Sequence, residues 1–360
     1  MFEKDRSASP VRPGSIKRGR RQPSIKDIAR LARVSHPTVS RALQNSPLVN
    51  AKTAAKIRKI ADEAGYRPSA VARGLVTRRT RTIGLVVTTV NDPFAAEVTL
   101  GIEQAANEHG YSVYLANSNA EPERERRMVQ AFAEQRVDGI IVTSSRVGAL
   151  YLPLLAEMMV PIVLLNDQYP GEFVHSVLIE NVQGTRAAVT HLIELGHRRI
   201  AYVGDRSGYH SDTERLNGYK EALAAAEIAF APELAVAGDG RPEAAIKAVN
   251  GLLALDHAPT AICCYNDMTA LGAMHAIHSR GLDIPGDISV TGFDDLFFAS
   301  YLQPPLTTVH QPMRRMGQMA MESLLKLMSG EESVALTRVE SKLVVRESTG
   351  KAKANGQRRD

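Results

Sequence analysis

Polar side chains recur at or directly after the apolar runs of the chain from residue 81 onward. The runs read TIGLVVTTV, YSVYLANS, GIIVTSS, PIVLLND, RIAYVGD, ELAVAGD, AICCYND and DISVTGFDD. The polar residues at their ends are Asn91, Asp92, Asn117, Thr143, Asn166, Asp205, Asn266, Asp267 and Asp294. Carboxylates and amides of this kind bond sugar hydroxyls. Each Asn or Asp alone also suits a turn or a helix cap, so it is their concentration that indicates a cleft for a polar ligand.

Aromatic residues lie in or next to the same segments, at Phe94, Tyr265, Phe293, Phe297 and Phe298. Such a ring can pack on the ring of a ligand, although it more often fills a protein core.

The sequence patterns of common catalytic sites are not found. No G-x-G-x-x-G follows the first apolar run, and neither G-x-x-x-x-G-K-[ST] nor G-x-S-x-G occurs. The ten histidines show no metal-ligand spacing, and the two cysteines, Cys263 and Cys264, are adjacent inside an apolar run. We therefore expect no catalytic residue, no metal site and no cofactor, and we interpret both cysteines as reduced core residues.

Residues 35–43, SHPTVSRAL, indicate a second kind of chemistry. Ser35 suits the N-cap of a short helix that begins at His36, because Pro37 lies in the first turn, where its missing amide hydrogen has no intrahelical acceptor. The apolar face of this helix consists of Val39, Ala42 and Leu43. Its polar side chains are Thr38, Ser40 and Arg41. These side chains are free to contact phosphates and bases, and the fork of an arginine matches the O6 and N7 acceptors of guanine.

Two further helices are expected beside this one, forming a domain over residues 23–68. Ser24 and Asp27 form a capping box at the start of the first helix, and the third helix starts near Asn50. Two short helices joined by a tight turn in a basic domain are typical of a helix-turn-helix, whose second helix enters the major groove of DNA. Residues 1–22 lack apolar periodicity and are rich in basic residues, so we expect a disordered tail there.

Charge is distributed unevenly along the chain. Residues 1–81 carry a net charge of +15, whereas the remainder carries −10. This asymmetry predicts a polyanionic partner at the basic end, with nucleic acid and an anionic membrane surface as the main candidates. No apolar run approaches the roughly 18 to 20 residues that span a bilayer, and the first residues lack the apolar segment of a secretory signal. We therefore expect a cytoplasmic protein, located at the bacterial nucleoid if its partner is DNA.

From residue 81 onward, the apolar runs alternate with stretches of helical periodicity such as RAAVTHLIELG. Near-continuous apolar strands alternating with amphipathic helices are typical of parallel sheets covered on both faces. Eight such units in two groups of four predict two similar α/β lobes, divided near Glu180. In open parallel sheets a ligand binds beyond the carboxyl ends of the strands, which is where the polar residues above are expected.

The stretches TVSRAL and GYRPSAVAR resemble, in order and spacing, the headpiece of the LacI/GalR family of bacterial transcription regulators. This resemblance implies dimeric binding to a near-palindromic operator, with base contacts from the second helix. It also implies that residues 69–80 form a hinge helix and linker, with Leu75 wedged into the minor groove. The DNA-binding residues assigned on this basis are Ser24, Ser35, His36, Pro37, Thr38, Ser40, Arg41, Asn50, Ser69, Arg73 and Leu75.

Two residues depart from the usual pattern of the family. Arg33 stands where a glycine is common in the turn, and a left-handed conformation there would cost another residue roughly 1 to 2 kcal/mol. Gly74 stands inside the expected hinge helix, where it costs up to about 1 kcal/mol relative to alanine. We therefore expect a strained or altered turn, and a hinge helix that is unstable without DNA.

Residues 81–346 resemble the effector domain of the same family and the related periplasmic sugar-binding proteins, through motifs such as ERLNGYKEAL and DISVTGFDD. The resemblance implies that Arg215 and Asp294 are the principal effector contacts, with Asn266 beside them. From the residues alone, Arg215 also suits a surface ion pair with Glu214 or Glu221. The other effector residues assigned are Asn91, Phe94, Thr143, Asn166, Ser211 and Gln311.

The effector domain is expected to consist of a first lobe, about residues 81–180 and 311–335, and a second lobe, about residues 181–310 and 336–346. A disordered tail is expected over residues 347–360.

The predicted function is that of a sequence-specific repressor whose affinity for double-stranded operator DNA is controlled allosterically by a small polar effector, a sugar or sugar derivative. A homodimer is expected, and a tetramer is compatible with the sequence. An enzyme and a transport-type binding protein are the alternatives. The first lacks a catalytic motif, and the second lacks a signal peptide and leaves the basic headpiece without a role.

Overall fold

The structure is a computed structural model that describes residues 23–67, 74, 79–145, 147, 160–166, 175–206, 209–332 and 336–353. Contacts divide the chain into two compact units, Met1–Arg78 and Arg79–Asp360. The division falls inside the segment expected to be a hinge and linker. Each unit is described by itself below.

The first unit contains three helices in its described part: α1 (Ile25–Ala32), α2 (His36–Leu43) and α3 (Ala51–Glu63). Each helix begins at the cap that the sequence predicts, namely Ser24, Ser35 and Asn50. Each of these side chains accepts a hydrogen bond from the backbone amide three residues later, which satisfies a donor that the helix leaves open. The helices share one small core, in which Ile28, Val39 and Ile57 are fully buried.

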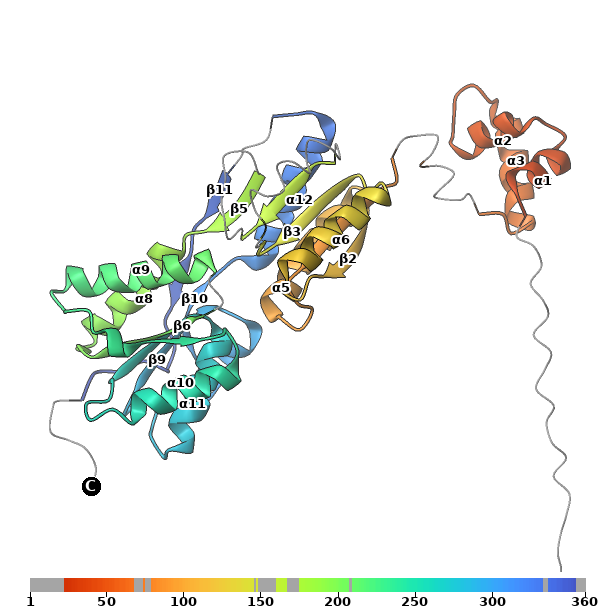
Figure 1. Cartoon of the computed structure of the whole chain (residues 1–360). Coiled ribbons are helices and arrows are strands. Elements are labelled where there is room, and N and C mark those ends of the chain that lie inside the picture. The colour runs from red at the N-terminus through yellow and green to blue at the C-terminus, as the bar shows by residue number, and fades with distance from the viewer. Residues whose placement is uncertain are drawn as a thin grey trace, which may run out of the picture. The chain divides into compact units, whose positions relative to one another are not determined.

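The second unit consists of two lobes, each built on a central sheet (Figure 1). The described strands of the first sheet lie in the order β11-β5-β4-β3-β1-β2 and pair in parallel. Their bounds are β1 (Thr82–Val87), β2 (Ser112–Asn117), β3 (Gly139–Thr143), β4 (Ile162–Leu165), β5 (His175–Ile179) and β11 (Leu336–Val339). Helices α5 (Pro93–Glu108) and α12 (Met313–Ser329) pack on one face, and α6 (Pro122–Glu134) packs on the other.

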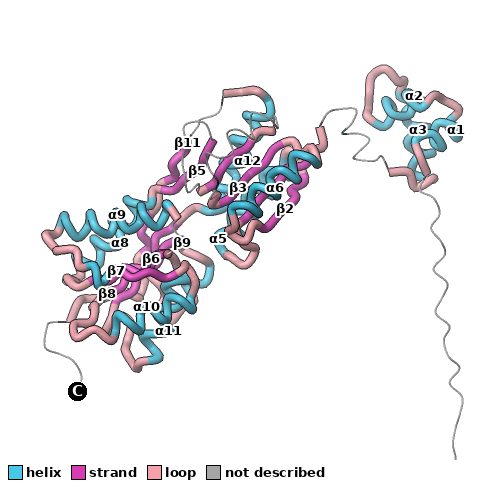
Figure 2. Tube along the Cα trace, in the orientation of Figure 1, coloured by secondary structure: helices cyan, strands magenta, loops and turns pink. Residues whose placement is uncertain are grey.

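The second sheet has the equivalent order β12-β10-β9-β8-β6-β7. Its strands are β6 (Ile200–Asp205), β7 (Ala235–Gly238), β8 (Ala261–Cys264), β9 (Ser289–Asp294), β10 (Thr307–His310) and β12 (Lys342–Val344). Strand β12 is antiparallel to β10, and the other described pairs are parallel. Helices α8 (Asn181–Glu194) and α9 (His210–Ala225) cover one face, while α10 (Pro242–Leu253) and α11 (Asp267–Ser279) cover the other (Figure 2).

The shared strand order confirms the expectation of two similar α/β lobes. The eight apolar runs correspond to β1 to β4 and β6 to β9. Strands β3, β6 and β9 are buried along their whole length, which explains their continuous apolar sequences. Short 3₁₀ helices at η2 (Pro232–Leu234) and η3 (Phe297–Ser300) complete the second lobe.

The chain passes between the lobes three times: after β5, after β10 and after β11. The first and third passages contact each other, because Glu180 N–H donates to the Val339 carbonyl at 3.0 Å and the Ser341 hydroxyl donates to the Glu180 carbonyl at 3.0 Å. Residues 336–339 pair with β5 and therefore belong to the first lobe. The expectation that the second lobe resumes at residue 336 is wrong, because the chain completes a strand of the first sheet before it returns.

The expectation of a disordered tail from residue 347 is wrong for residues 347–353, which pack on the second lobe. Ser348 is fully buried, and its hydroxyl donates to the Val290 carbonyl at 2.6 Å and accepts from Thr307 N–H at 2.8 Å. The imidazole of His197 lies 3.0 Å from the carbonyl of Gly350. Residues 354–360 lie outside the described residues.

Helix α12 packs closely against α5. A Cβ on Gly317 would lie 2.3 Å from the backbone oxygen of Val98, and a Cβ on Gly101 would lie 2.0 Å from that of Arg314, so this contact requires glycine at both positions. The buried methionines of α12 are Met313, Met316 and Met321. They belong to the core of the first lobe.

Cys263 and Cys264 are buried in β8 and form no disulfide. Burial raises the pKa of the Cys263 thiol to about 11, so it stays protonated and weakly nucleophilic at neutral pH. In the part of the chain that the structure describes, no helix combines the length and the apolar character needed to cross a bilayer.

Candidate functional site

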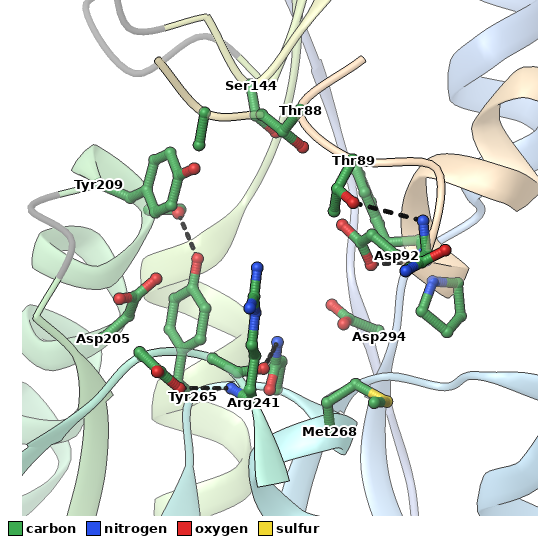
Figure 3. Close-up of a pocket in the computed structure, with 18 of the residues that line it drawn as sticks. Thr88, Thr89, Asp92, Ser144, Asp205, Tyr209, Arg241, Tyr265, Met268 and Asp294 are labelled. Carbon is green, nitrogen blue, oxygen red and sulfur yellow. Dashed lines mark hydrogen bonds between the residues drawn. The ribbon is translucent and has the colours of Figure 1, made fainter. Parts of the chain in front are cut away.

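A cavity of about 780 Å³ lies between the two lobes (Figure 3). Its walls come from the segments that follow β1 to β4 in the first lobe and from the corresponding ends of β6 to β10 in the second. These are the carboxyl ends of parallel strands, where ligands bind in open α/β sheets. The cavity therefore lies where the sequence predicts a binding cleft.

Eight of the nine residues assigned to the effector site line this cavity: Asn91, Phe94, Asn166, Ser211, Arg215, Asn266, Asp294 and Gln311. Thr143 does not line it, because its side chain is buried and its hydroxyl donates to the Val86 carbonyl at 3.4 Å. The next residue, Ser144, lines the cavity instead. Successive side chains of a strand point to opposite faces, so a shift of one residue changes which side chain reaches the cavity.

Arg215 is held firmly by α9 and its surroundings, with only 3% of its surface exposed. Its Nε donates to Asn181 Oδ1 at 2.9 Å, and its Nη1 donates to the backbone carbonyl of Tyr265 at 2.5 Å. The guanidinium also lies over two rings, 3.7 Å from the centre of Phe293 and 4.6 Å from the centre of Tyr265. The remaining nitrogen, Nη2, lies 3.9 Å from Asp294 Oδ1.

This burial rules out the surface ion pair that the sequence left open for Arg215. The two glutamates form ion pairs with other arginines. Glu221 Oε2 lies 3.8 Å from Arg186 Nη1, and Glu214 Oε1 lies 3.6 Å from Arg338 Nη1. The side chain therefore belongs to the wall of the cavity.

Asp294 ends β9 with a carboxylate that is almost fully buried. Gln311 Nε2 donates to its Oδ1 at 2.5 Å. Burial raises the pKa of Asp294 to about 7, and the nearby positive charge of Arg215 opposes the rise. The φ angle of Asp294 is 118°, in a region that favours glycine, so the backbone is strained at this site.

Asn266 and Tyr265 organise the floor of the cavity after β8. The Asn266 side chain caps α11 by accepting from Thr269 N–H at 2.8 Å, and its Nδ2 donates to the Gly240 carbonyl at 3.2 Å. The hydroxyls of Tyr265 and Ser211 lie 2.9 Å apart. Asn266 is thus oriented by its own bonds, and it connects the segment after β7 to α11.

The first lobe contributes Asp92, whose carboxylate caps α5 and accepts from Phe94 N–H at 3.0 Å. Burial raises the pKa of Asp92, while the positive charge of Arg241 in the second lobe lowers it. Ser144 and Asn166 also line this side, and both have positive φ angles, 48° and 54°. Strained polar residues that follow neighbouring strands are a frequent feature of binding sites.

Several residues that line the cavity were not assigned from the sequence. They include Thr88, Thr89, Ser144, Tyr209, Arg241, Tyr265 and Met268. The cavity residues Asp92, Asp205 and Tyr265 could have been assigned from the sequence, because they lie at the ends of apolar runs or beside them. Of the other candidate rings, Phe293 lies behind Arg215, Phe298 packs against the first core, and Phe297 is 72% exposed.

The cavity offers hydroxyl, amide, carboxylate and guanidinium groups, which suit reversible binding of a polar molecule. Among the described residues, no group of His, Cys, Asp or Glu side chains is arranged to hold a metal ion.

Helix α2 of the headpiece is the helix that the sequence predicts to enter the major groove. His36, Pro37 and Arg41 are exposed, while Thr38 and Ser40 are partly exposed. The buried side of α2 is formed by Val39 and Ala42. The sequence prediction of an exposed polar face on a short helix is therefore met. Ser69, Arg73 and Leu75, the DNA-binding residues assigned to the hinge, lie outside the described residues.

Arg33 has φ 57° and ψ 46°, the left-handed conformation that its position in the turn predicts. The turn is therefore strained, as expected, because a residue with a side chain adopts a conformation that favours glycine. A second feature of the headpiece that the sequence did not reveal is Arg58, whose Nη2 donates to Asn45 Oδ1 at 2.6 Å and joins α3 to the segment after α2.

Two family models match the chain. The model described as bacterial regulatory proteins, lacI family, matches residues 24–69, and the model of a periplasmic binding protein-like domain matches residues 189–349. A transcriptional repressor PurR of Aliivibrio fischeri (strain MJ11) is 37% identical over 306 residues, which are 84% of this chain and 91% of that protein. A probable repressor ExuR of Bacillus subtilis (strain 168) is 36% identical over 317 residues, 87% of this chain and 93% of that protein.

Solved structures agree with these relatives. The Lac repressor dimer bound to operator and the anti-inducer ONPF has a TM-score of 0.85 and 29% identity, and the match covers 92% of this chain and all of that chain. The complex of the transcriptional regulator CelR with cellobiose has a TM-score of 0.68 and 32% identity, and covers 91% of this chain and 99% of that chain. The chain therefore belongs to the LacI family of bacterial regulatory proteins, as a DNA-binding transcriptional regulator.

Proposed function

We propose that the chain is a repressor that binds a near-palindromic operator as a homodimer and changes its operator affinity when a small polar molecule enters the cavity between the lobes. The observation that carries this proposal is the buried pair of Arg215 and Asp294 at the cavity wall, 3.9 Å apart. The chemistry of the lining favours a sugar, a sugar derivative or a metabolite of similar polarity. The cellobiose in the complex of the regulator CelR agrees with this class.

Coupling follows from the three passages between the lobes. An effector that bonds Arg215 and Asp294 on one lobe and Asp92 or Asn166 on the other stabilises one relative arrangement of the lobes. Allostery requires that the effector bind this arrangement better than the alternative, and the difference in affinity sets the size of the response. The hinge over residues 69–80 would transmit the arrangement to the DNA-binding unit.

The DNA contacts would come from α2. Arg41 suits a guanine edge, and Ser24, Ser35 and Asn50 stand at helix N-termini, which favour phosphate oxygens. The hinge residues Ser69, Arg73 and Leu75 would contact the minor groove. A protein with this role acts at the chromosome, so we assign it to the cytoplasm and the nucleoid.

The dimer would use the exposed apolar side chains of the first lobe. Leu100 on α5 is 48% exposed, and Tyr114 and Leu115 on the edge strand β2 are 54% and 46% exposed. Exposed apolar side chains on neighbouring elements favour association, because contact removes them from water. The same unpaired edge of the sheet would be covered in a dimer.

Selection from a random duplex library tests the DNA-binding part of this proposal. The full chain should enrich a near-palindromic sequence and bind it at least about a thousandfold more tightly than unrelated duplex at physiological salt. Enrichment of no sequence, or equal affinity for both duplexes, would contradict operator recognition.

A further inference from the structure

Arg241 is a positively charged residue of the cavity wall whose guanidinium makes no hydrogen bond or ion pair with the described residues. It lines the cavity, and Figure 3 shows its side chain rising into the open space between Tyr265 and Asp294. Its backbone N–H donates to Asp239 Oδ1 at 3.1 Å, but within the described ranges no hydrogen bond or ion pair engages its guanidinium. Arg241 is exposed, and a guanidinium that lines a cavity without a hydrogen-bonded protein partner is suited to a planar anionic group of a ligand.

Arg241 also stands at a helix N-terminus that is open toward the cavity. It is the N-cap of α10, a helix of 12 residues, and its side chain makes no capping bond. Tyr209 is the N-cap of α9 and makes no capping bond either, and it lines the same cavity. The N-terminal residues of both helices thus line the cavity, and each helix also carries an acidic residue in its first turn, Asp212 in α9 and Glu243 in α10. The positive end of a helix favours negative charge, and these two side chains supply part of it.

The carboxylates that line the cavity belong to Asp92, Asp205, Asp239, Glu243 and Asp294, and three of them make contacts with groups other than the Arg241 guanidinium. Asp239 accepts the backbone N–H of Arg241 and lies 4.0 Å from the Arg206 guanidinium, while Asp92 caps α5. Asp294 accepts from Gln311, and because burial raises its pKa to about 7, it carries a proton for part of the time at neutral pH. The charge of Arg241 lowers the pKa of Asp92, but among the described residues no carboxylate forms an ion pair with the Arg241 guanidinium.

A buried acceptor also lines the cavity. Gln311 is 1% exposed, and its Oε1 has no hydrogen-bond partner, although its Nε2 donates to Asp294. An unsatisfied buried acceptor favours a donor such as a ligand hydroxyl, since leaving it unpaired is costly. The site therefore combines a position for a hydroxyl with a position for an anion.

We propose that the effector is a hydroxylated molecule that carries an anionic group, a carboxylate or a phosphate, and that Arg241 is the residue that selects for this group. This inference rests on the proposed function, because it names the chemical class of the ligand for the same cavity. It separates this chain from regulators whose effectors are neutral sugars. A neutral sugar would leave the Arg241 guanidinium facing the ligand without a partner.

Isothermal titration calorimetry on the full chain with matched neutral and acidic ligands tests the proposal. The pairs are D-galactose with D-galacturonate and D-glucose with D-glucuronate for a carboxylate, and D-glucose with D-glucose 6-phosphate and D-ribose with D-ribose 5-phosphate for a phosphate. We expect at least one acidic member to bind about tenfold or more tightly than its neutral partner. If the tighter ligand is a uronate, the anionic group is a carboxylate, and if it is a sugar phosphate, the group is a phosphate.

The variant Arg241→Gln should remove the preference, so that the acid binds no more tightly than its neutral partner. The control Arg186→Gln removes the same charge from the same lobe at a half-exposed ion pair with Glu221, outside the cavity lining, and should keep the preference. Equal or tighter binding of the neutral members would overturn the inference, as would an acid preference that survives in Arg241→Gln. Binding of no member of any pair would contradict the proposed effector site itself as well.

Discussion

The guanidinium of Arg215 on α9 lies 3.9 Å from the carboxylate of Asp294 at the end of β9, and both side chains are almost fully buried. A buried ion pair contributes little net stability, because the cost of removing both charges from water offsets their attraction. Here the pair forms part of a cavity wall, and its geometry is fixed by Asn181 and Gln311. A ligand that bonds to both side chains therefore meets groups that are already oriented.

Arg215→Lys tests the role of this geometry. Lysine keeps the positive charge but lacks the planar fork, so it loses the simultaneous bonds to Asn181 and Tyr265. We expect the affinity for the tightest ligand of the neutral and acidic pairs to fall at least tenfold in calorimetry, with operator affinity in the absence of ligand unchanged. Arg186→Lys is the matched control. Unchanged ligand affinity in Arg215→Lys would show that Arg215 does not contact the ligand.

Asp294→Asn should change how stability depends on pH. The folded chain raises the pKa of this carboxyl from 3.8 to about 7, so across this range the folded state binds a proton that the unfolded state has released. The free energy of unfolding of the wild type therefore falls as pH rises through this window. Asparagine does not titrate, so the Tm of Asp294→Asn relative to wild type should increase from about pH 5 to about pH 8. A difference in Tm that is constant with pH would contradict the raised pKa.

Arg41→Ala tests the assignment of α2 as the recognition helix. Arg41 is exposed on α2, and loss of a base contact should cost about 1 to 3 kcal/mol on the selected operator and much less on unrelated duplex. Fluorescence anisotropy at one fixed salt concentration measures both affinities. The control is Lys59→Ala, which removes an exposed charge of α3 that lies 3.9 Å from Glu63. An equal loss on both duplexes would identify Arg41 as a phosphate contact.

Arg33→Gly should stabilise the headpiece by about 1 kcal/mol, because glycine adopts the observed left-handed conformation without a steric penalty. Amide hydrogen exchange of α1 and α2 in the full chain measures this change. Arg33→Ala is the control, since alanine removes the charge but keeps the penalty of a Cβ. Equal protection in both variants would attribute the effect to charge instead of backbone conformation.

The fold could be predicted from the sequence where elements are long or buried on both sides. The apolar runs identified β1 to β4 and β6 to β9, and the capping residues Ser24, Ser35 and Asn50 fixed the starts of the headpiece helices. Strands β5 and β10 are largely buried but were not identified, because HSVLI and TTVH mix polar and apolar residues. Strands β11 and β12 were missed because they are partly exposed and lack a continuous apolar run. The ordering of residues 347–353 depends on Ser348 entering the second lobe, a contact between segments far apart in sequence.

The candidate site was predictable where a residue lies at the end of a strand. Asp294 and Asn266 follow buried strands and could be placed by that pattern alone, whereas Thr143 was misplaced by one residue. The position of Arg241 in the cavity could not be predicted from the sequence, because GDGRPEA indicates only a turn before a helix. Only the packing of α10 against the second sheet brings its side chain to the cavity.

The central claim is that occupancy of the cavity changes operator affinity. A fluorescence anisotropy titration of the selected operator, with and without a saturating concentration of the tightest ligand of the pairs, measures this coupling most directly. We expect at least a fivefold change in operator affinity for the wild-type chain, within the range typical of allosteric coupling. At a ligand concentration close to the wild-type Kd, Arg215→Lys should show a smaller change, because its cavity is filled to a smaller extent. An operator affinity that is identical with and without ligand, under conditions where calorimetry shows the cavity to be filled, would contradict the central claim.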